Sequence, residues 1–245
     1  MKKIKLFIAV FLILTGIGGM LNKDYFAALI FIAIGVCLFV FPRNKQRTGS
    51  PSADVIPGGL GMRSEISDDY TRVHCDEWVV FDVETTGLSP YEDRIIEVAA
   101  VKYKNGEKVD AFVSLVNPGV PLSARITDLT GITDKELKKA PRFSKIGQQL
   151  ADFIGDLPLV AHNAKFDVDF LIVECARAGV KIDVRYIDTV RMAKWCLPPQ
   201  PDYKLASLIE TFGLLDHAQE HRALSDVEAC ENLYMRCRTR KSRSV

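Results

Sequence analysis

The sequence predicts an α/β domain built around a mixed β-sheet, preceded by a transmembrane helical hairpin. In the body of the chain, apolar β-branched segments come first as a meander and then alternate with segments of helical periodicity, which is typical of a mixed sheet. Ahead of the body, two charge-free apolar stretches occupy residues 6–21 and 25–41. Together these features predict one α/β domain with a membrane anchor.

Composition and charge narrow the class of protein. The chain has 245 residues, of which 48% are hydrophobic and 26% charged, so it is neither disordered nor collagen-like. It is also too short for a large multidomain enzyme. The formal net charge of +1 hides an asymmetry, because residues 1–47 carry +6, residues 48–235 carry −10 and the last ten residues carry +5. An acidic body between two basic ends requires an explanation.

The two apolar stretches predict a transmembrane hairpin within residues 1–42. A spanning helix needs about 20 apolar residues, with about 17 as the lower edge. The stretches of sixteen and seventeen residues are therefore short spans. Lysines precede the first stretch and basic residues follow the second, so the positive-inside rule places both ends of the hairpin in the cytoplasm.

A cleaved signal peptide followed by a single span is the alternative for these residues. Lys2, Lys3 and Lys5 suit the basic start of a signal peptide, but no A-x-A-like cleavage site follows the first apolar run. Either arrangement leaves the remainder of the chain on the cytoplasmic side.

The composition changes after the anchor and again near the end of the chain. Residues 43–76 are rich in Pro, Gly, Ser and Asp without an apolar period, which predicts a flexible linker. Residues 77–236 hold the predicted domain. Residues 237–245 form a basic tail, which either attracts phosphates or anionic lipids or is simply solvated.

The secondary structure of the body follows from its apolar patterns. The strands predicted from apolar runs are, in order, 77–84, 94–104, 108–116 and 157–161. The second and third are joined by Asn105-Gly106, the strongest short signal for a β-hairpin. Helical periodicity predicts helices over 143–154, 167–178, 205–212 and 223–236.

Cysteine spacing excludes two classes of small domain. The six cysteines stand at positions 37, 75, 175, 196, 230 and 237. None forms a CxxC pair, so the chain is neither a zinc ribbon nor a disulfide scaffold. We predict reduced cysteines that act as small hydrophobic residues in a reducing compartment.

The first strand ends in two carboxylates, Asp82 and Glu84. Residues two apart on a strand share a face, so both point one way while Phe81 and Val83 point the other. Adjacent carboxylates repel each other and are costly to bury, and a bound Mg²⁺ or Mn²⁺ offsets that cost. The pair therefore predicts either a metal site or a solvated strand end.

A third carboxylate, Asp167, opens the helix predicted at 167–178. Phe170 and Leu171 lie three and four residues further on and share its face, so Asp167 is expected to face the core. Asp169 is expected to face solvent, because it lies about 200° around the helix from Asp167. An inward carboxylate at this position is either a metal ligand or a helix cap.

The last predicted helix repeats this pattern with Asp226. Ala229 and Cys230 lie three and four residues beyond it, which places Asp226 on the apolar face and leaves Glu228 off that face. His221 stands just before the helix, near the same end. It is either a catalytic base or a structural hydrogen-bonding residue.

The segment from His217 to His221 also fits H-x-x-E-H, an inverted zinc-peptidase signature. This alternative needs a helix through both histidines, whereas the preceding Phe212-Gly213 suggests that a helix ends there. It also leaves the other carboxylate segments unexplained.

Together the three segments resemble the motifs of the DEDDh 3′–5′ exonuclease family, and most closely the DnaQ-like proofreading exonuclease of the DNA polymerase III epsilon or PolC type. FDVETTGL, HNAKFDVDFL and HRALSD match the three motifs in order, and DRIIEVAAV, LTGITDKEL and YKLASL match the connecting stretches. A histidine separated from the last Asp by four residues marks the DEDDh branch. The hydrophobic hairpin lies outside the family pattern, so whether a polymerase is the partner stays open.

The resemblance implies a fold, a cofactor and a set of site residues. The fold would be ribonuclease H-like, a mixed sheet flanked by helices. Two divalent cations, Mg²⁺ or Mn²⁺, would be held by Asp82, Glu84, Asp167 and Asp226. His221 would act as the general base. The terminal nucleotide would be held by the segment of Thr85, Thr86, Gly87 and Leu88.

We therefore expect a membrane-tethered exonuclease that shortens single-stranded DNA from its 3′ end and releases nucleoside 5′-monophosphates. RNA or short oligonucleotides are the alternative substrate, because the sequence does not separate ribose from deoxyribose. A non-catalytic nucleic-acid-binding module at the membrane is the alternative of another class, although all five site residues are present. The expected location is the bacterial inner membrane, with lipid contact through residues 6–41 and the catalytic domain on the cytoplasmic face.

Overall fold

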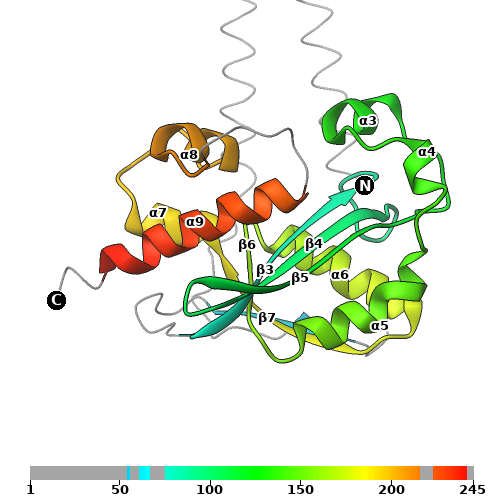
Figure 1. Ribbon diagram of the computed structural model, residues 1–245, viewed down its shortest axis with the longest axis horizontal. Coiled ribbons are helices and arrows are strands. Elements are labelled where there is room, and N and C mark those ends of the chain that lie inside the picture. The colour runs from blue at the N-terminus through cyan, green and yellow to red at the C-terminus, as the bar shows by residue number, and fades with distance from the viewer. Residues whose placement is uncertain (1–53, 56–60, 67–74, 216–222, 242–245) are drawn as a thin grey trace, which may run out of the picture. The chain divides into compact units, whose positions relative to one another are not determined.

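The computed structural model describes residues 54–55, 61–66, 75–215 and 223–241 (Figure 1). Its strands are β1 (Asp54–Val55), β2 (Gly61–Glu65), β3 (Glu77–Thr85), β4 (Ile95–Lys104), β5 (Glu107–Leu115), β6 (Leu159–Ala161) and β7 (Ile182–Asp188). Its helices are α3 (Ala124–Thr130), α4 (Asp134–Leu137), α5 (Phe143–Ile154), α6 (Lys165–Ala178), α7 (Thr189–Cys196), α8 (Leu205–Phe212) and α9 (Ala223–Lys241).

The strands form one mixed sheet in the order β1-β2-β7-β6-β3-β4-β5 (Figure 1). Neighbours among β3, β4 and β5 are antiparallel, whereas β6 is parallel to β3 and to β7, and β2 is parallel to β7. The four strands predicted from the sequence are β3 to β6, with ends shifted by at most two residues. Asn105 and Gly106 take φ angles of 53° and 84°, as a two-residue hairpin turn requires. The predicted mixed sheet is confirmed.

Helices cover both faces of the sheet, with α5 and α6 on one side and α7 and α9 on the other (Figure 1). Alternation along β3 divides the core accordingly. Val79, Phe81 and Val83 pack with α5 and α6, whereas Trp78 and Val80 pack with α7, α8 and α9. The even-numbered residues of β3 therefore face α9, as do the two carboxylates that continue this series.

The pairing of β3 with β6 is short, and this opens an edge of β3. Only Val79 with Leu159 and Val80 with Val160 are paired, after which β6 leads towards α6. Beyond Val80 the backbone of β3 is therefore available to other partners on that side. The carboxyl ends of these parallel strands lie at the same edge of the sheet, which is where α/β proteins place their sites.

Part of the predicted linker is structured. Residues 61–65 form β2, which pairs along its length with β7, from Gly61 opposite Ile182 to Glu65 opposite Tyr186. The prediction of a flexible linker over 43–76 is therefore wrong for these residues. A short strand that extends an existing sheet takes its hydrogen bonds from the neighbouring strand, so it needs little apolar periodicity of its own.

The helices agree with their predicted ranges, with two extensions. α5 and α8 have the predicted bounds, whereas α6 begins at Lys165, two residues before the predicted start. α9 continues to Lys241, so residues 237–241 of the predicted basic tail are helical. No Gly or Pro interrupts this stretch, and the helix therefore has no local reason to end at 236.

The cysteines differ from their prediction. Cys196, at the end of α7, and Cys237, on α9, form a disulfide, and their Cα atoms are 5.7 Å apart. The prediction of reduced cysteines is therefore wrong for this pair, because packing of α7 against α9 brings together residues 41 positions apart. Cys75, Cys175 and Cys230 are free.

The predicted hairpin within residues 1–42 lies outside the described residues, as do the last four residues of the tail. Within the part of the chain that the structure describes, none of the helices combines the length and apolar character needed to cross a membrane.

Candidate active site

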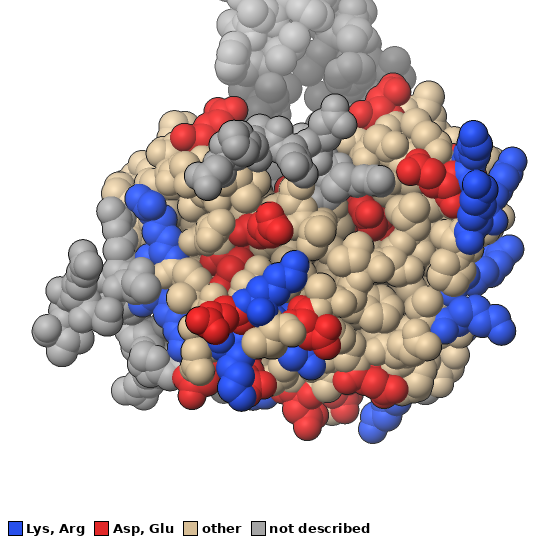
Figure 2. All heavy atoms as spheres, in the orientation of Figure 1, with Lys and Arg blue, Asp and Glu red and all other residues tan. Residues whose placement is uncertain are grey.

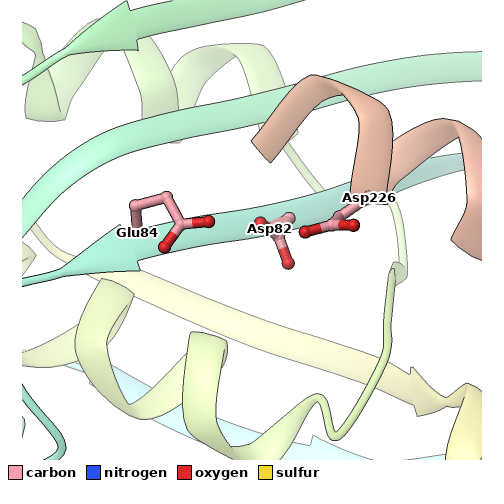
Figure 3. Close-up of side chains that lie close together, drawn as sticks. All are labelled: Asp82, Glu84 and Asp226. Atoms are coloured by element: carbon pink, nitrogen blue, oxygen red, sulfur yellow. The ribbon is translucent and has the colours of Figure 1, made fainter. Parts of the chain in front are cut away.

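Three of the predicted carboxylates meet at one point. Asp82, Glu84 and Asp226 each offer an oxygen atom, and these atoms all lie within 4.8 Å of one another. The first two come from β3, and Asp226 comes from the first turn of α9. Figure 3 shows the Asp226 carboxylate directed towards Asp82, with Glu84 further along the strand. Packing of Val227 and Cys230 into the core beneath α9 holds Asp226 over the strand.

Asp167 reaches the same site from the other face of the sheet. Its side chain is only 3% exposed, and its Oδ1 atom accepts a hydrogen bond of 3.2 Å from the backbone N–H of Val83. This N–H lies on the edge of β3 that β6 leaves open. Asp167 is not among the residues whose oxygen atoms lie within 4.8 Å, but its charge raises the pKa of Asp82. The prediction that it faces inward is confirmed.

The electrostatics of the cluster favour a bound cation. Burial, and then the charges of Asp167 and Asp226, raise the pKa of Asp82 well above its ordinary value. Burial and the charge of Asp226 raise the pKa of Glu84 to about 7. Burial also raises the pKa of Asp167. Carboxylates forced together in this way lose their mutual repulsion when a cation binds. Because every donor is a hard oxygen, the residues fit Mg²⁺ or Mn²⁺.

Glu97 is a member of the site that the sequence analysis missed. It stands directly opposite Glu84 in the β3–β4 ladder and is 7% exposed. Its Oε2 atom accepts a 3.3 Å hydrogen bond from the backbone N–H of Ala223, the first residue of α9. Glu97 thus joins the start of the helix that carries Asp226 to the strand beside Glu84. The available signal was a single charge within the apolar run IIEVAAV.

The predicted general base, His221, lies outside the described residues, as does the H-x-x-E-H segment. The chain on either side of this gap is defined. α8 ends at Phe212, and Gly213 follows with a φ angle of 58°, a common way for a helix to end. α9 begins at Ala223, two residues after His221.

The loop after β3 has a fixed shape. The hydroxyl of Thr85 donates to the carbonyl of Gly87 at 2.6 Å, and the hydroxyl of Thr86 donates to the Asp93 carboxylate at 3.0 Å. A Cβ atom at Gly87 would overlap this carboxylate, so glycine is required there by close approach. The loop leaves Leu88 83% exposed.

Asp169 differs from its prediction. Its side chain is 18% exposed and forms ion pairs with Lys165 of α6 and with Arg63 of β2. The prediction of a solvent-facing residue is therefore only partly right, because the unpredicted strand β2 brings Arg63 to it. Glu228, predicted to lie off the apolar face of α9, is exposed.

The exonuclease family profile matches residues 79–234. The chain belongs to the exonuclease family. The matched range contains the four carboxylates, and the three motifs identify the domain as a 3′–5′ exonuclease of the DEDDh type. Exonucleases of this type use divalent metal ions, in agreement with the oxygen cluster.

Relatives of this exonuclease domain occur within much longer proteins. The PolC-type DNA polymerase III of Bacillus cereus is 44% identical over 155 residues, which cover 63% of this chain and 11% of the relative. The corresponding Bacillus subtilis protein is 40% identical over 191 residues, covering 72% of this chain and 13% of the relative. This chain thus matches about an eighth or less of the length of these relatives.

Solved exonuclease structures share the fold. Exonuclease X in complex with 5′ overhanging duplex DNA superimposes with a TM-score of 0.55 at 25% identity, covering 66% of this chain and 91% of that one. The nuclease domain of 3′hExo, a DEDDh family member bound to rAMP, superimposes with a TM-score of 0.58 at 22% identity, covering 67% of this chain and 92% of that one. The ribonuclease H-like domain expected from the motifs is confirmed.

Proposed function

We propose that this protein is a membrane-tethered 3′–5′ exonuclease that removes nucleoside 5′-monophosphates from the 3′ ends of single-stranded DNA. The observation that carries the proposal is the cluster of Asp82, Glu84 and Asp226, whose oxygen atoms lie within 4.8 Å of one another, with Asp167 buried behind it. Two Mg²⁺ or Mn²⁺ ions held by these carboxylates would supply Lewis-acid activation of the attacking water and of the leaving 3′ oxygen.

We assign roles in the reaction to the residues around the cluster from their positions in the chain. His221 stands two residues before α9 and is proposed to take the proton from the attacking water. An imidazole with an ordinary pKa of about 6.5 suits that task near neutral pH. The segment from Thr85 to Leu88 is proposed to hold the terminal nucleotide, with backbone groups on its polar atoms and Leu88 against its base.

The choice of DNA rests on the relatives. The matching Bacillus proteins are DNA polymerases, and the Exonuclease X structure contains DNA. RNA remains the other substrate to test, since both share the phosphodiester chemistry of the site.

The membrane part of the proposal rests on the distribution of apolar and basic residues. Residues 6–41 contain the two charge-free stretches, and basic residues flank them on both sides. We propose that they anchor the protein in the bacterial inner membrane, with the exonuclease domain on the cytoplasmic face.

The test compares full-length protein with two variants in nonionic detergent. Asp226→Asn removes a charge from the cluster, and Glu228→Gln makes the matching change at an exposed position of the same helix. Each protein receives 5′-labelled single-stranded DNA or RNA of the same sequence, with Mg²⁺, Mn²⁺ or EDTA. We expect a metal-dependent ladder that shortens from the 3′ end, unchanged in Glu228→Gln and slowed about 10³-fold in Asp226→Asn.

The result also separates the alternatives. Faster cleavage of RNA would change the substrate and leave the reaction class intact. A folded, metal-binding protein that cleaves neither substrate would contradict the exonuclease proposal and favour a binding module.

A further inference from the structure

A cavity of about 650 Å³ opens between the end of β6, helix α7 and the loop that enters α8. His162 and Asn163 line it from the β6 side, Lys194 from α7, and Tyr203 and Lys204 from the loop, which also brings the carboxylate of Asp202 to the rim. Lys194 and Lys204 are exposed, whereas His162 and Tyr203 are partly buried. None of these residues has a part in the function proposed above.

One short segment of chain connects the lining of the cavity to a carboxylate of the proposed metal centre. His162 and Asn163 connect β6 to α6, and Asp167 lies in the first turn of that helix. β3, which carries Asp82, runs parallel to β6, so the two strands end at the same edge of the sheet. The cavity and the carboxylate cluster therefore lie at the same edge of the sheet.

The turn between β6 and α6, beside the cavity, is held in place by hydrogen bonds. Asn163 takes a φ angle of 63°, and its backbone N–H donates to Oδ1 of Asp188 at 3.2 Å. The same carboxylate oxygen accepts the N–H of Val190 and so caps α7. Asp188 therefore fixes the start of α7 relative to the segment that leads to Asp167.

His162 holds the opposite wall in place. Its Nε2 atom lies 2.9 Å from the carbonyl oxygen of Tyr203, and since a carbonyl only accepts, Nε2 carries the hydrogen. Its Nδ1 atom lies 3.0 Å from the hydroxyl oxygen of Thr189, and a neutral ring accepts a hydrogen bond there only when this hydroxyl turns away from the carbonyl of Ala161, 3.2 Å away. Burial lowers the pKa of His162 and so favours that neutral ring. The loop is thereby joined to the end of β6, and the Tyr203 ring lies 5.6 Å from Nζ of Lys194.

We propose that this cavity binds the nucleotides that precede the terminal one in the substrate strand. Lys194 and Lys204 contact their phosphates, and the Tyr203 ring packs against a base. The inference rests on the proposed exonuclease function and extends it. Residues 48–235 carry a net charge of −10, so a polyanion needs local cations to stay bound beside the acidic centre. Lysine and an aromatic ring together are the usual means of holding single strands without sequence preference.

The first test uses the unaltered full-length protein in detergent with Mg²⁺. The substrates are the p-nitrophenyl ester of thymidine 5′-monophosphate, which has no preceding nucleotide, and oligothymidylates of two, three, four and six residues. We expect KM to fall with each added nucleotide, by a total of about 10-fold or more, and then to level off once the cavity is filled. A KM that is the same from the ester to the hexamer would overturn the proposal. Absence of turnover on every substrate would instead overturn the exonuclease function itself.

The second test changes the lysines. We compare Lys194→Gln/Lys204→Gln with Lys108→Gln/Lys181→Gln, which makes the same charge change at exposed positions outside the cavity. The measured quantity is the KM for the hexamer divided by the KM for the ester, as a function of salt. We expect this ratio to rise severalfold in the first variant only. Its logarithmic salt dependence should become shallower by about 1.4, the effect of losing two phosphate contacts on a single strand. A ratio and a salt slope equal to those of the control variant would overturn the proposal. An equal rise in the KM for the ester and the KM for the hexamer would also overturn it, because that result would place the lysines at the terminal nucleotide.

Discussion

At the scale of single residues, the metal centre depends on carboxylates that disfavour one another and on groups that hold them in place. Asp82 and Glu84 occupy neighbouring positions of one strand face, and Asp226 is held against them by α9. Val83 contributes through its backbone, whose N–H fixes Asp167. Glu97 contributes by accepting the first N–H of α9. The proposed ligands are thus positioned by hydrogen bonds made by groups outside the ligand set.

Replacement of Glu97 tests this positioning. Glu97→Ala removes the acceptor for the Ala223 N–H, so the first turn of α9 loses its bond to β4. We expect kcat to fall about 10–100-fold, which corresponds to the loss of a buried, charged hydrogen bond. Glu97→Gln keeps an oxygen acceptor and should retain more of the rate. Steady-state kinetics at saturating metal provide the measurement, with exposed Glu107→Ala as the control. Equal rates for Glu97→Ala and the control would show that α9 is held in place without this bond.

The raised pKa of Glu84 predicts how stability depends on pH. Its pKa is about 7 in the folded protein and about 4.5 when unfolded, because burial and then Asp226 disfavour the charged form. Its contribution to stability is therefore complete below pH 4.5 and is lost as the pH rises through 7. In EDTA, we expect the melting temperature to fall between pH 5 and pH 8, and to fall less in Glu84→Gln. A melting temperature that rises over this range in EDTA would contradict the assignment.

At the scale of elements, β3 organises the domain through its two faces. One face packs on α5 and α6, and the other packs on α7, α8 and α9. On this second face, the apolar residues are followed by Asp82 and Glu84 at the end of the strand. Because its pairing with β6 ends at Val80, the same strand also receives Asp167 at its edge. This strand therefore contacts both α6 and α9, which carry the other two carboxylates of the proposed site.

β2 is an element whose contribution can be isolated. It hydrogen-bonds to β7 over five positions, and Gly61 packs so closely against Ile172 that a side chain would not fit. We expect a fragment of residues 77–245 to melt several degrees below a fragment of residues 54–245, because it lacks β2 and exposes the edge of β7. Thermal denaturation of both fragments in EDTA is the measurement. Identical melting temperatures would mean that β2 adds no stability to the sheet.

At the scale of the whole molecule, charge is unevenly distributed. Figure 2 shows acidic and basic side chains mixed over part of the visible face, and a row of Lys and Arg along the edge that α4 and α5 form. The exposed cations of these helices and the turn between them are Lys135, Lys138, Lys139, Arg142 and Lys145. The acidic body repels a polyanion, and bound cations reverse that effect locally at the centre.

Metal binding should stabilise the folded protein. The carboxylate cluster forms only in the native state, so Mg²⁺ or Mn²⁺ binds the native chain and not the unfolded one. We expect millimolar metal to raise the melting temperature by several degrees at pH 8, and to have little effect on Asp82→Asn. Differential scanning fluorimetry with and without EDTA provides the comparison. An unchanged melting temperature in the unaltered protein would exclude a site formed in advance of substrate.

Removal of the proposed anchor tests the division of the chain. We expect a fragment of residues 48–245 to be soluble and to keep the exonuclease activity, because it retains β1, β2 and every proposed site residue. The full-length protein should instead be recovered with membranes. Fractionation and the ladder assay measure the two properties. An inert but folded fragment would mean that residues 1–47 take part in catalysis.

The sequence by itself determined the local features of this protein. The alternation of β3 assigned Asp82 and Glu84 to one face, and helical spacing turned Asp167 inward. The Asn105-Gly106 pair specified its hairpin. These features depend on residues only a few positions apart. The repeat of two residues in a strand and of about 3.6 residues in a helix determines them directly.

Only the tertiary structure decided the contacts between distant segments. It added β2 to the sheet, 121 residues from its partner strand, placed Glu97 under α9, and joined Cys196 to Cys237. It also built the cavity beside β6 from three separate segments. Such contacts come from the packing of elements against one another. No local periodicity in the sequence encodes which elements pack against each other, because that depends on the free energy of the whole fold.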